Sequence, residues 1–302
     1  MPTSLTDVIG LICCPDDGGS LSFARGELHC TACERRFPVY GENLVEILPR
    51  GRLELPSSIS SQYREGYKKA FEQKYQGDEE SLAWGAEESV TKSWSVKRRR
   101  QVEFVRSLVT QGTRTGDSVL CDIAAGAGYY TLAYARLFRL VLHCDLSVDN
   151  LNYARRKAQS LGIRNVFFVR ADYFGLPFRN SLERLLCMDA LIRGEGHESL
   201  LLESIATSLD ADGFALVDFH NWWHNPLRRL GLVRNNFAWN RSYTKRELKH
   251  LLASRHIAQS GLFSFIQELS GDGTGRGLLR KILPATRFVV RIQGTVGAGK
   301  SR

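Results

Sequence analysis

Long apolar segments are missing from this sequence. No run approaches the roughly 18 to 20 residues that a membrane-spanning helix requires. The short apolar stretch at residues 8–12 has no positively charged segment before it and no small-residue cleavage site after it, as a secretion signal would have. The seven cysteines are an odd count, and three of them lie in strand-like apolar runs, which argues against a disulfide framework. These absences predict a protein of the reducing cytoplasm without a membrane span.

Lysine is missing from one end of the chain, and acidic residues are missing from the other. Residues 1–50 contain no lysine and carry seven acidic against four arginine residues, whereas residues 276–302 contain no acidic residue and seven basic ones. Together with the basic run at 97–100, this tail could attract the phosphates of nucleic acid or anionic lipid. A solvated helix face and a frayed end are the simpler interpretation. Charge alone therefore does not select a partner.

Internal repeats are also missing, since no period of roughly 20 to 50 residues recurs, and composition divides the chain into four parts. Residues 1–50 are rich in cysteine and turns, 51–110 form a predicted linker and helical cap, 111–293 alternate strand-like and helical patterns, and 294–302 are a basic tail. In the cap, aromatic residues recur at every fourth position and share one helix face: Tyr63, Tyr67, Phe71 and Tyr75. Residues 294–301 satisfy the P-loop pattern, but no helix follows them in this sequence, so we expect no phosphate site there.

The pattern of residues 111–293 predicts a doubly wound α/β domain. Strands are expected at 118–123, 140–145, 166–169, 184–188 and 214–219. Helices are expected at 129–137, after an N-cap at Ser147, and at 198–209, where a turn at 210–213 ends the last of them. Such alternation builds a parallel sheet, whose ligand binds outside the carboxyl ends of the strands.

A loop with two glycines follows the first predicted strand and precedes a helix. Gly126 and Gly128 fit the first two positions of the dinucleotide fingerprint, but the third falls on Thr131, which argues against NAD or FAD. The loop instead resembles the first motif, D/E-x-G-x-G-x-G, of class I S-adenosylmethionine-dependent methyltransferases, and the resemblance implies that this loop holds the methionine moiety of the cofactor. Asp122 stands at its acidic position and Ala124 at its first glycine. An alanine fits that position only if its φ is negative.

The resemblance continues at the next strand ends and implies a set of contacts with S-adenosylmethionine. Asp145 matches the acidic residue that binds the ribose in this family, and two carboxylate oxygens can accept from two vicinal hydroxyls. Asp172 matches the position that contacts adenine, and residues 172–178 resemble the family's D-x-x-x-L-P-F stretch. The resemblance implies a Rossmann-like, seven-stranded methyltransferase sheet. The implied cofactor contacts are Asp122, Ala124, Gly126, Gly128, Asp145, Leu146, Asp172, Tyr173 and Met188.

The cysteine-rich start predicts a small β-rich ribbon. Two knuckles of C-x2-C spacing normally direct four thiolates at one tetrahedral zinc ion. The segment is similar to the Trm112-like zinc-ribbon domain, with an aspartate at the expected second cysteine. That aspartate can ligate zinc, Cys13 or His29 could substitute for it, or the ribbon could fold without metal. The predicted ligand set is Cys14, Asp17, Cys30 and Cys33.

The segment after the fifth predicted strand is the expected acceptor side. His220 is the predicted general base, and Trp222 and Trp223 offer an apolar wall, which favours a small metabolite or lipid-like acceptor. An rRNA or tRNA acceptor is the alternative, because bacterial rRNA guanine-N1 methyltransferases also carry a zinc ribbon ahead of this core. A non-catalytic binding protein with the same fold is a third hypothesis.

Overall fold

A computed structural model of the chain describes residues 3–50, 92–112, 115–190, 197–224, 227, 230–232, 242–265 and 285–294. The predicted linker at 56–61, the aromatic stripe at 63–75 and all but the first residue of the P-loop-like tail lie outside the described residues. Within these ranges, no helix combines the length and the apolar character needed to cross a membrane.

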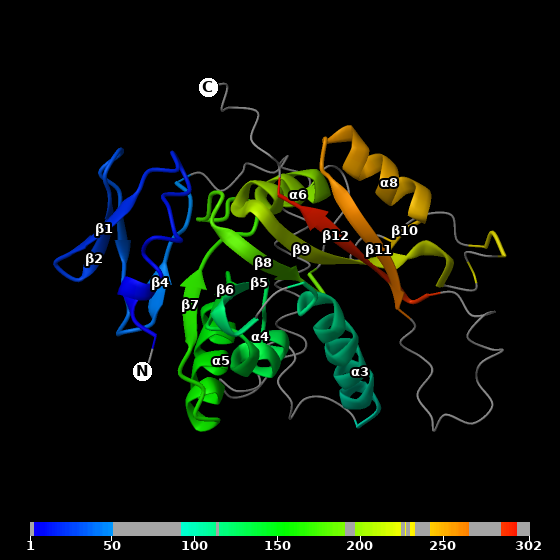
Figure 1. The fold of residues 1–302 in the computed structure, drawn as a ribbon, viewed down its shortest axis with the longest axis horizontal. Coiled ribbons are helices and arrows are strands. Elements are labelled where there is room, and N and C mark those ends of the chain that lie inside the picture. Colours follow the sequence, from blue (N-terminus) through cyan, green and yellow to red (C-terminus); the bar gives the residue numbers. More distant parts are fainter. Residues whose placement is uncertain are drawn as a thin grey trace.

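The described residues build one large sheet with nine strands, in the order β11-β12-β9-β8-β5-β6-β7-β4, and β10 pairs with β9 (Figure 1). Seven of them form the predicted Rossmann-like sheet: β5 (Val119–Ile123), β6 (Leu140–Asp145), β7 (Val166–Arg170), β8 (Leu182–Cys187), β9 (Leu209–Asn221), β11 (Gln259–Phe265) and β12 (Arg287–Gln293). Two more strands join it, β4 (Leu44–Glu46) and β10 (Ser242–Tyr243). All pairs are parallel except those of β12, which is antiparallel to β9 and to β11. The α/β prediction is therefore confirmed.

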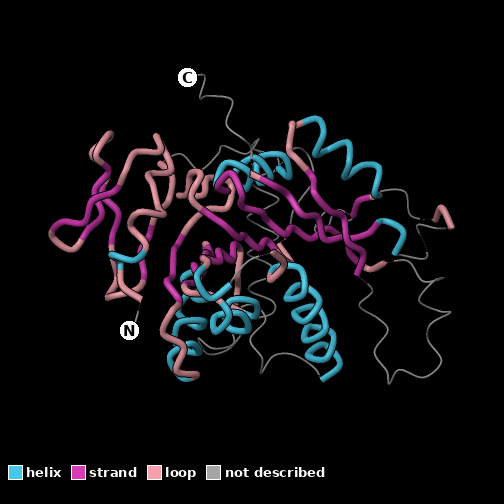
Figure 2. The backbone as a smooth tube through the Cα atoms, in the orientation of Figure 1, coloured by secondary structure: helices cyan, strands magenta, loops and turns pink. Residues whose placement is uncertain are grey.

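Helices cover both faces of this sheet, as the coloured tube in Figure 2 shows. Helices α3 (Lys92–Val109), α4 (Tyr129–Tyr134) and α5 (Val148–Ser160) lie on one face, and α6 (His197–Ser208) and α8 (Lys245–Ser254) on the other. Short 3-10 turns complete the described part: η1 (Leu5–Asp7), η3 (Thr115–Asp117), η4 (Ala135–Leu137) and η5 (Trp222–His224). Every residue of β5 and β6 is buried, as expected for parallel strands covered on both sides.

Local capping explains where two helices begin. The Ser147 hydroxyl accepts a hydrogen bond from the Asn150 amide, which confirms the predicted N-cap of α5. Thr244 and Glu247 form a capping box at the start of α8. The predicted turn at 210–213 is wrong, because β9 begins at Leu209, directly after α6. The pairing of β8 with β9 changes register between Leu182 and Arg184, so the strand continues through this irregular stretch.

The N-terminal ribbon packs against the large sheet and contributes one strand to it. Strands β1 (Leu21–Ala24), β2 (Glu27–Cys30) and β3 (Arg36–Pro38) form the predicted β-rich unit, an antiparallel sheet of their own. The next strand, β4, then pairs in parallel with β7 and extends the edge of the large sheet. Buried ribbon residues such as Leu28 and Phe37 belong to the same hydrophobic cluster as Phe167 and Val169 of β7. Ribbon and sheet therefore share one core.

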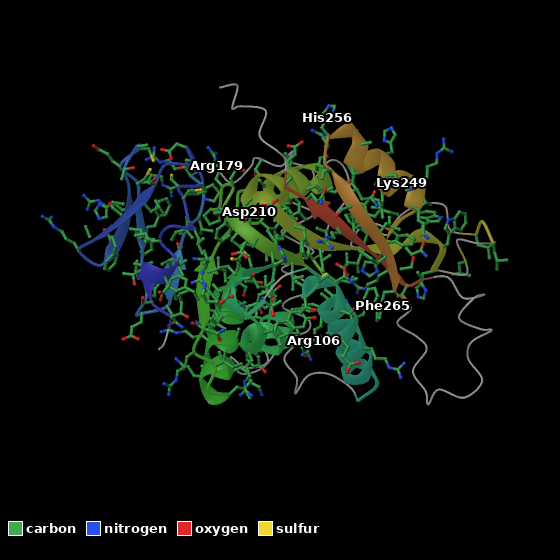
Figure 3. All side chains as sticks on the ribbon, in the orientation of Figure 1. Arg106, Arg179, Asp210, Lys249, His256 and Phe265 are labelled. Atoms are coloured by element: carbon green, nitrogen blue, oxygen red, sulfur yellow. The ribbon has the colours of Figure 1, made fainter. Side chains whose placement is uncertain are left out.

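Polar contacts attach the ribbon to the loops that follow β6 and β7. Glu46 of β4 forms an ion pair of 2.7 Å with Arg170, whose Nε also donates to the Leu146 carbonyl at 3.1 Å. The Cys13 amide donates to the Pro177 carbonyl at 2.8 Å. Arg179 lies against the ribbon at Gly18, where a Cβ would stand 2.3 Å from its guanidinium (Figure 3). The ribbon thus supports the loops in which cofactor contacts were predicted.

Candidate functional site

The glycine loop lies at the carboxyl end of β5, beside the point where the strand order reverses between β5 and β8. Ligands of open α/β sheets bind at such a reversal. Three loop residues have positive φ: Ala124 at 51°, Gly126 at 57° and Gly128 at 83°. A side chain at position 128 would also stand 3.2 Å from the Ala154 Cβ of α5, so glycine is required there. The loop therefore presents bare backbone to whatever binds above it.

The conformation of Ala124 corrects the expectation of a negative φ. The loop is held by three hydrogen bonds, from the amides of Ala125, Gly126 and Gly128 to Cys144, Asp145 and Ala125. These bonds hold Ala124 in a left-handed conformation, which is strained for a residue with a Cβ.

Replacing this alanine with glycine should stabilise the protein. Ala124→Gly removes the left-handed strain and should raise the free energy of unfolding by about 1 kcal/mol, which corresponds to roughly 2–4 °C in melting temperature. Thermal denaturation measures the shift. The matched control is Ala127→Gly in the same loop, where φ is not positive and the methyl group is buried, so that this change should lower the melting temperature. A lower value for Ala124→Gly as well would show that the loop carries no such strain.

Asp145 connects the glycine loop to helix α5. Its Oδ2 accepts from the Gly126 amide at 2.8 Å, and its Oδ1 accepts from the Ser147 amide at 2.8 Å and from Asn150 Nδ2 at 3.2 Å. Burial raises the pKa of Asp145, and the hydrogen bonds from Ser147 and Gly126 oppose that rise. The structure therefore brings the predicted ribose ligand and the predicted methionine loop into direct contact.

Asp122 lies beneath the same loop and stabilises the start of helix α4. Its side chain is buried and accepts from the amide and the hydroxyl of Thr131 at 3.0 and 2.7 Å, which anchors the first turn of α4. The Thr131 hydroxyl also lies 2.9 Å from Nδ1 of His143. Burial lowers the pKa of His143 to about 3, so this imidazole stays neutral near neutral pH.

The remaining predicted cofactor residues lie at neighbouring strand ends. Leu146 follows β6, and its carbonyl is held by Arg170. Asp172 and Tyr173 follow β7, where the Asp172 carboxylate accepts from the Phe174 amide at 3.0 Å and shapes the turn. Met188 follows β8 and is buried against the helix α3 and α4 side of the sheet. All these positions follow the carboxyl ends of parallel strands, where the sequence predicted the ligand.

Sequence reasoning missed a polar cluster at the ends of β8 and β9, which we call the Asp189 cluster. Arg287 Nη1 forms an ion pair of 2.5 Å with Asp189 and a second one with Asp218. Gln101 of α3 and Tyr130 of α4 donate to Asp189 Oδ2 at 3.3 and 3.5 Å. Asp218 is an acidic residue inside the apolar run of β9, and this was the one sequence signal that pointed to the cluster. Arg287 and Gln101 are far away in the sequence and gave none.

His220 lies next to this cluster. It is two residues after Asp218 on β9 and directly opposite Arg287 in the antiparallel pairing with β12. Residues opposite each other, and residues two apart on one strand, lie on the same face of a sheet. The predicted base therefore shares its face with the Asp189 cluster. The aromatic turn η5 follows β9 directly, and Trp223 in it is 47% exposed.

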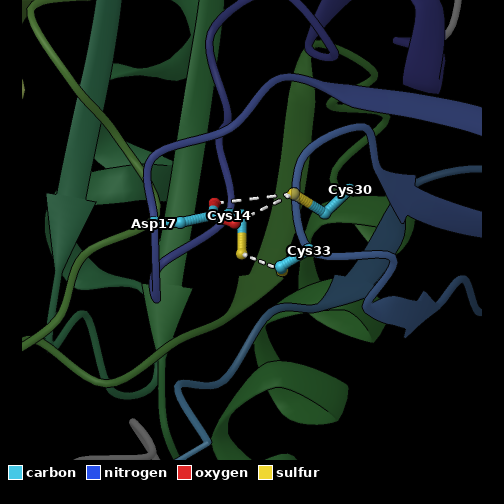
Figure 4. Close-up of side chains that lie close together, drawn as sticks. All are labelled: Cys14, Asp17, Cys30 and Cys33. Atoms are coloured by element: carbon cyan, nitrogen blue, oxygen red, sulfur yellow. Dashed lines mark hydrogen bonds between the residues drawn. The ribbon is translucent and has the colours of Figure 1, made fainter.

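The ribbon gathers the predicted metal ligands, Cys14, Asp17, Cys30 and Cys33 (Figure 4). Their ligand atoms all lie within 4.8 Å of one another, and no other group of at least three such ligands occurs in the described part of the chain. The thiols of Cys14 and Cys33 are 3.7 Å apart, and Cys30 Sγ is 3.5 Å from Asp17 Oδ1. Two sulfur ligands of tetrahedral zinc, at about 2.3 Å from the ion, are separated by roughly 3.8 Å. The four donors therefore have the spacing of a tetrahedral zinc site, without Cys13 or His29.

The protonation of these donors fits a site that exchanges protons for metal. Burial raises the pKa of Cys14 to about 12, whereas hydrogen bonding from Cys33 holds the pKa of Asp17 well below its usual range. The Cys14 thiol is therefore protonated near neutral pH, and a bound cation would displace this proton.

Comparisons with known proteins agree with this geometry. Residues 120–213 match a methyltransferase domain family, and residues 8–41 match the Trm112p-like protein family. A tRNA/tmRNA (uracil-C(5))-methyltransferase of Idiomarina loihiensis is 27% identical over 176 residues, which make up 57% of this chain. The match spans only 45% of that relative's length.

Two solved structures share the fold. The magnesium protoporphyrin IX methyltransferase of Synechocystis PCC 6803 with bound SAH has a TM-score of 0.53 at 15% identity, covering 79% of this chain and 99% of that one. The geranyl diphosphate C-methyltransferase of Streptomyces coelicolor A3(2) has a TM-score of 0.51 at 16% identity, covering 72% and 86%. The domain match, the strand order and the glycine loop agree: residues 120–213 are similar to a methyltransferase domain, the chain has the fold of these methyltransferase structures, and a segment similar to the Trm112p-like family precedes that domain.

Proposed function

We propose that this protein transfers the methyl group of S-adenosylmethionine to a small, apolar acceptor molecule. The observation that carries the proposal is the contact between the glycine loop and Asp145, with Asp172 at the adjacent strand end. A bare backbone loop, a carboxylate and a polar turn at three successive strand ends suit a methionine moiety, a ribose and an adenine in that order.

The chain contributes binding and alignment. When bound, S-adenosylmethionine supplies a methyl group on a positively charged sulfur. Gly126 and Gly128 let the backbone approach the ligand, and Asp145 orients both the loop and the start of α5. Methyl transfer requires an in-line approach in a site shielded from water more than a nucleophile on the enzyme. His220 and the Asp189 cluster lie on the acceptor side, beyond the glycine loop.

Exposed apolar side chains favour an apolar acceptor. Trp223 and Leu227 are each 47% exposed, and Leu230 and Leu232 are 71% and 70% exposed. They are half of the eight large hydrophobic residues that are exposed in the described part of the chain, and they follow β9 within eleven positions. Such a concentration in one short segment supports an apolar acceptor. The structural relatives act on geranyl diphosphate and magnesium protoporphyrin IX, which are also small molecules.

RNA is the second candidate acceptor, because the curated relative modifies tRNA and tmRNA.

We also propose that the four ribbon donors hold one zinc ion, on the spacing of Cys14, Asp17, Cys30 and Cys33.

The acceptor is tested with methyl-labelled S-adenosylmethionine and two substrate pools, a small-molecule extract and fractionated RNA. We expect label in the small-molecule pool, and Trp223→Ala should lower its incorporation about tenfold, since a large buried contact with an aromatic anchor is worth more than 1 kcal/mol. The matched control is Phe23→Ala, an exposed aromatic residue of the ribbon hairpin.

The other outcomes separate the alternatives. Label in one RNA, with an affinity that falls steeply with salt, would replace the small-molecule acceptor by RNA. Binding of S-adenosylmethionine without transfer to either pool would indicate a non-catalytic binding protein.

A further inference from the structure

The Asp189 cluster joins five elements at one point. Gln101 comes from α3, Tyr130 from α4, Asp218 from β9 and Arg287 from β12, and all four contact Asp189 after β8. Tyr130 is the second residue of the helix that follows the glycine loop. The cluster therefore lies beside the predicted methionine end of the cofactor, at the strand reversal.

The two carboxylates of the cluster differ in accessibility. The Asp218 side chain is 1% exposed, whereas the Asp189 side chain is 19% exposed. Of these two carboxylates, that of Asp189 is therefore the one that a ligand can reach. A carboxylate held this way attracts a cation or a hydrogen-bond donor.

Contacts with neighbouring strands fix both the backbone and the carboxylate of Asp189. Its φ is 57°, and its amide donates to Asp218 Oδ1 at 2.8 Å. Arg287 contacts Asp189 and Asp218 from the opposite strand, so both the main chain and the side chain of Asp189 are fixed through Asp218. A strained conformation persists only where the surroundings impose it.

We propose that Asp189 receives the acceptor of the methyl transfer, and that Arg287 and Asp218 are its positioning residues. The inference rests on the proposed function and deepens it: the acceptor is a neutral or cationic molecule that presents an N–H or O–H group at the atom to be methylated. The lone pair of that atom bonds to the methyl carbon, the carbon–sulfur bond breaks with its electron pair left on sulfur, and the acceptor's proton passes to the Asp189 carboxylate. The charges balance, because the sulfonium is neutralised and the carboxylate takes up one proton.

A pair of ligands tests this without a known acceptor. S-adenosylhomocysteine lacks the transferred methyl group, whereas sinefungin carries a positively charged amine at that place. Calorimetry on the wild-type protein should show sinefungin binding about tenfold more tightly than S-adenosylhomocysteine, as a charge-assisted hydrogen bond predicts. Asp189→Asn should remove this preference and change the affinity for S-adenosylhomocysteine less than twofold.

The variant and its control are matched. Asparagine has the shape of aspartate and tolerates positive φ, so Asp189→Asn keeps the backbone. Asp212→Asn makes the same chemical change at an exposed position at the other end of β9, and should leave both affinities unchanged.

Each outcome decides the proposal. If the wild-type protein shows no preference for sinefungin, or if Asp189→Asn retains that preference, Asp189 does not face the reacting group and the proposal is wrong while the proposed function stands. If neither ligand binds the wild-type protein, the proposed function fails and this assignment fails with it.

Discussion

Replacing Asp145 with alanine is expected to lower the affinity for S-adenosylmethionine by about 30- to 150-fold. The estimate follows from the loss of two hydrogen bonds between a carboxylate and the ribose hydroxyls, on the order of 2–3 kcal/mol in total. The structure adds a second reason, because the same carboxylate holds the Gly126 amide and the start of α5. Calorimetric titration of the folded variant measures the change.

The control must distinguish ligand contact from loop support. Asp149→Ala removes a neighbouring carboxylate in the first turn of α5 and should change the affinity little. A fall in affinity for Asp145→Ala that accompanies a large drop in melting temperature would assign the effect to the loop. An unchanged dissociation constant would remove Asp145 from the cofactor site.

The second large effect is expected in the ribbon. The purified protein should contain about one equivalent of zinc, and Cys30→Ser should lose it, because a serine hydroxyl is a poor replacement for a thiolate ligand. The buried ribbon residues share a core with β7, so the loss should lower the melting temperature of the protein by roughly 5–15 °C.

Elemental analysis and thermal denaturation measure the two effects. Cys13→Ser is the matched control, since Cys13 adjoins Cys14 in the chain but does not belong to the group of four donors. A metal-free wild-type protein whose melting temperature is the same as that of Cys30→Ser would show that the ribbon folds on its apolar contacts alone.

Contacts between residues close in the chain explain why much of the site could be predicted. The Ser147 cap, the glycine loop between β5 and α4, and the two cysteine pairs of the ribbon are each encoded within a few residues. The Asp189 cluster is different. Its other members are 29 to 98 positions away from Asp189 in the sequence, and no local pattern links them.

The sequence by itself determined the alternation of strands and helices, the strand ends at which Asp145 and Asp172 lie, and the donors of the ribbon, because hydrophobic periodicity, turn residues and short spacings are local properties. Only the tertiary structure decided that β4 extends the large sheet, that Ala124 has a positive φ, and that Arg287 joins Asp189 to Asp218. These features depend on strand pairing and hydrogen bonding between segments that are distant in the sequence. Such contacts form and stabilise the structure only in the folded chain, so no local sequence pattern encodes them.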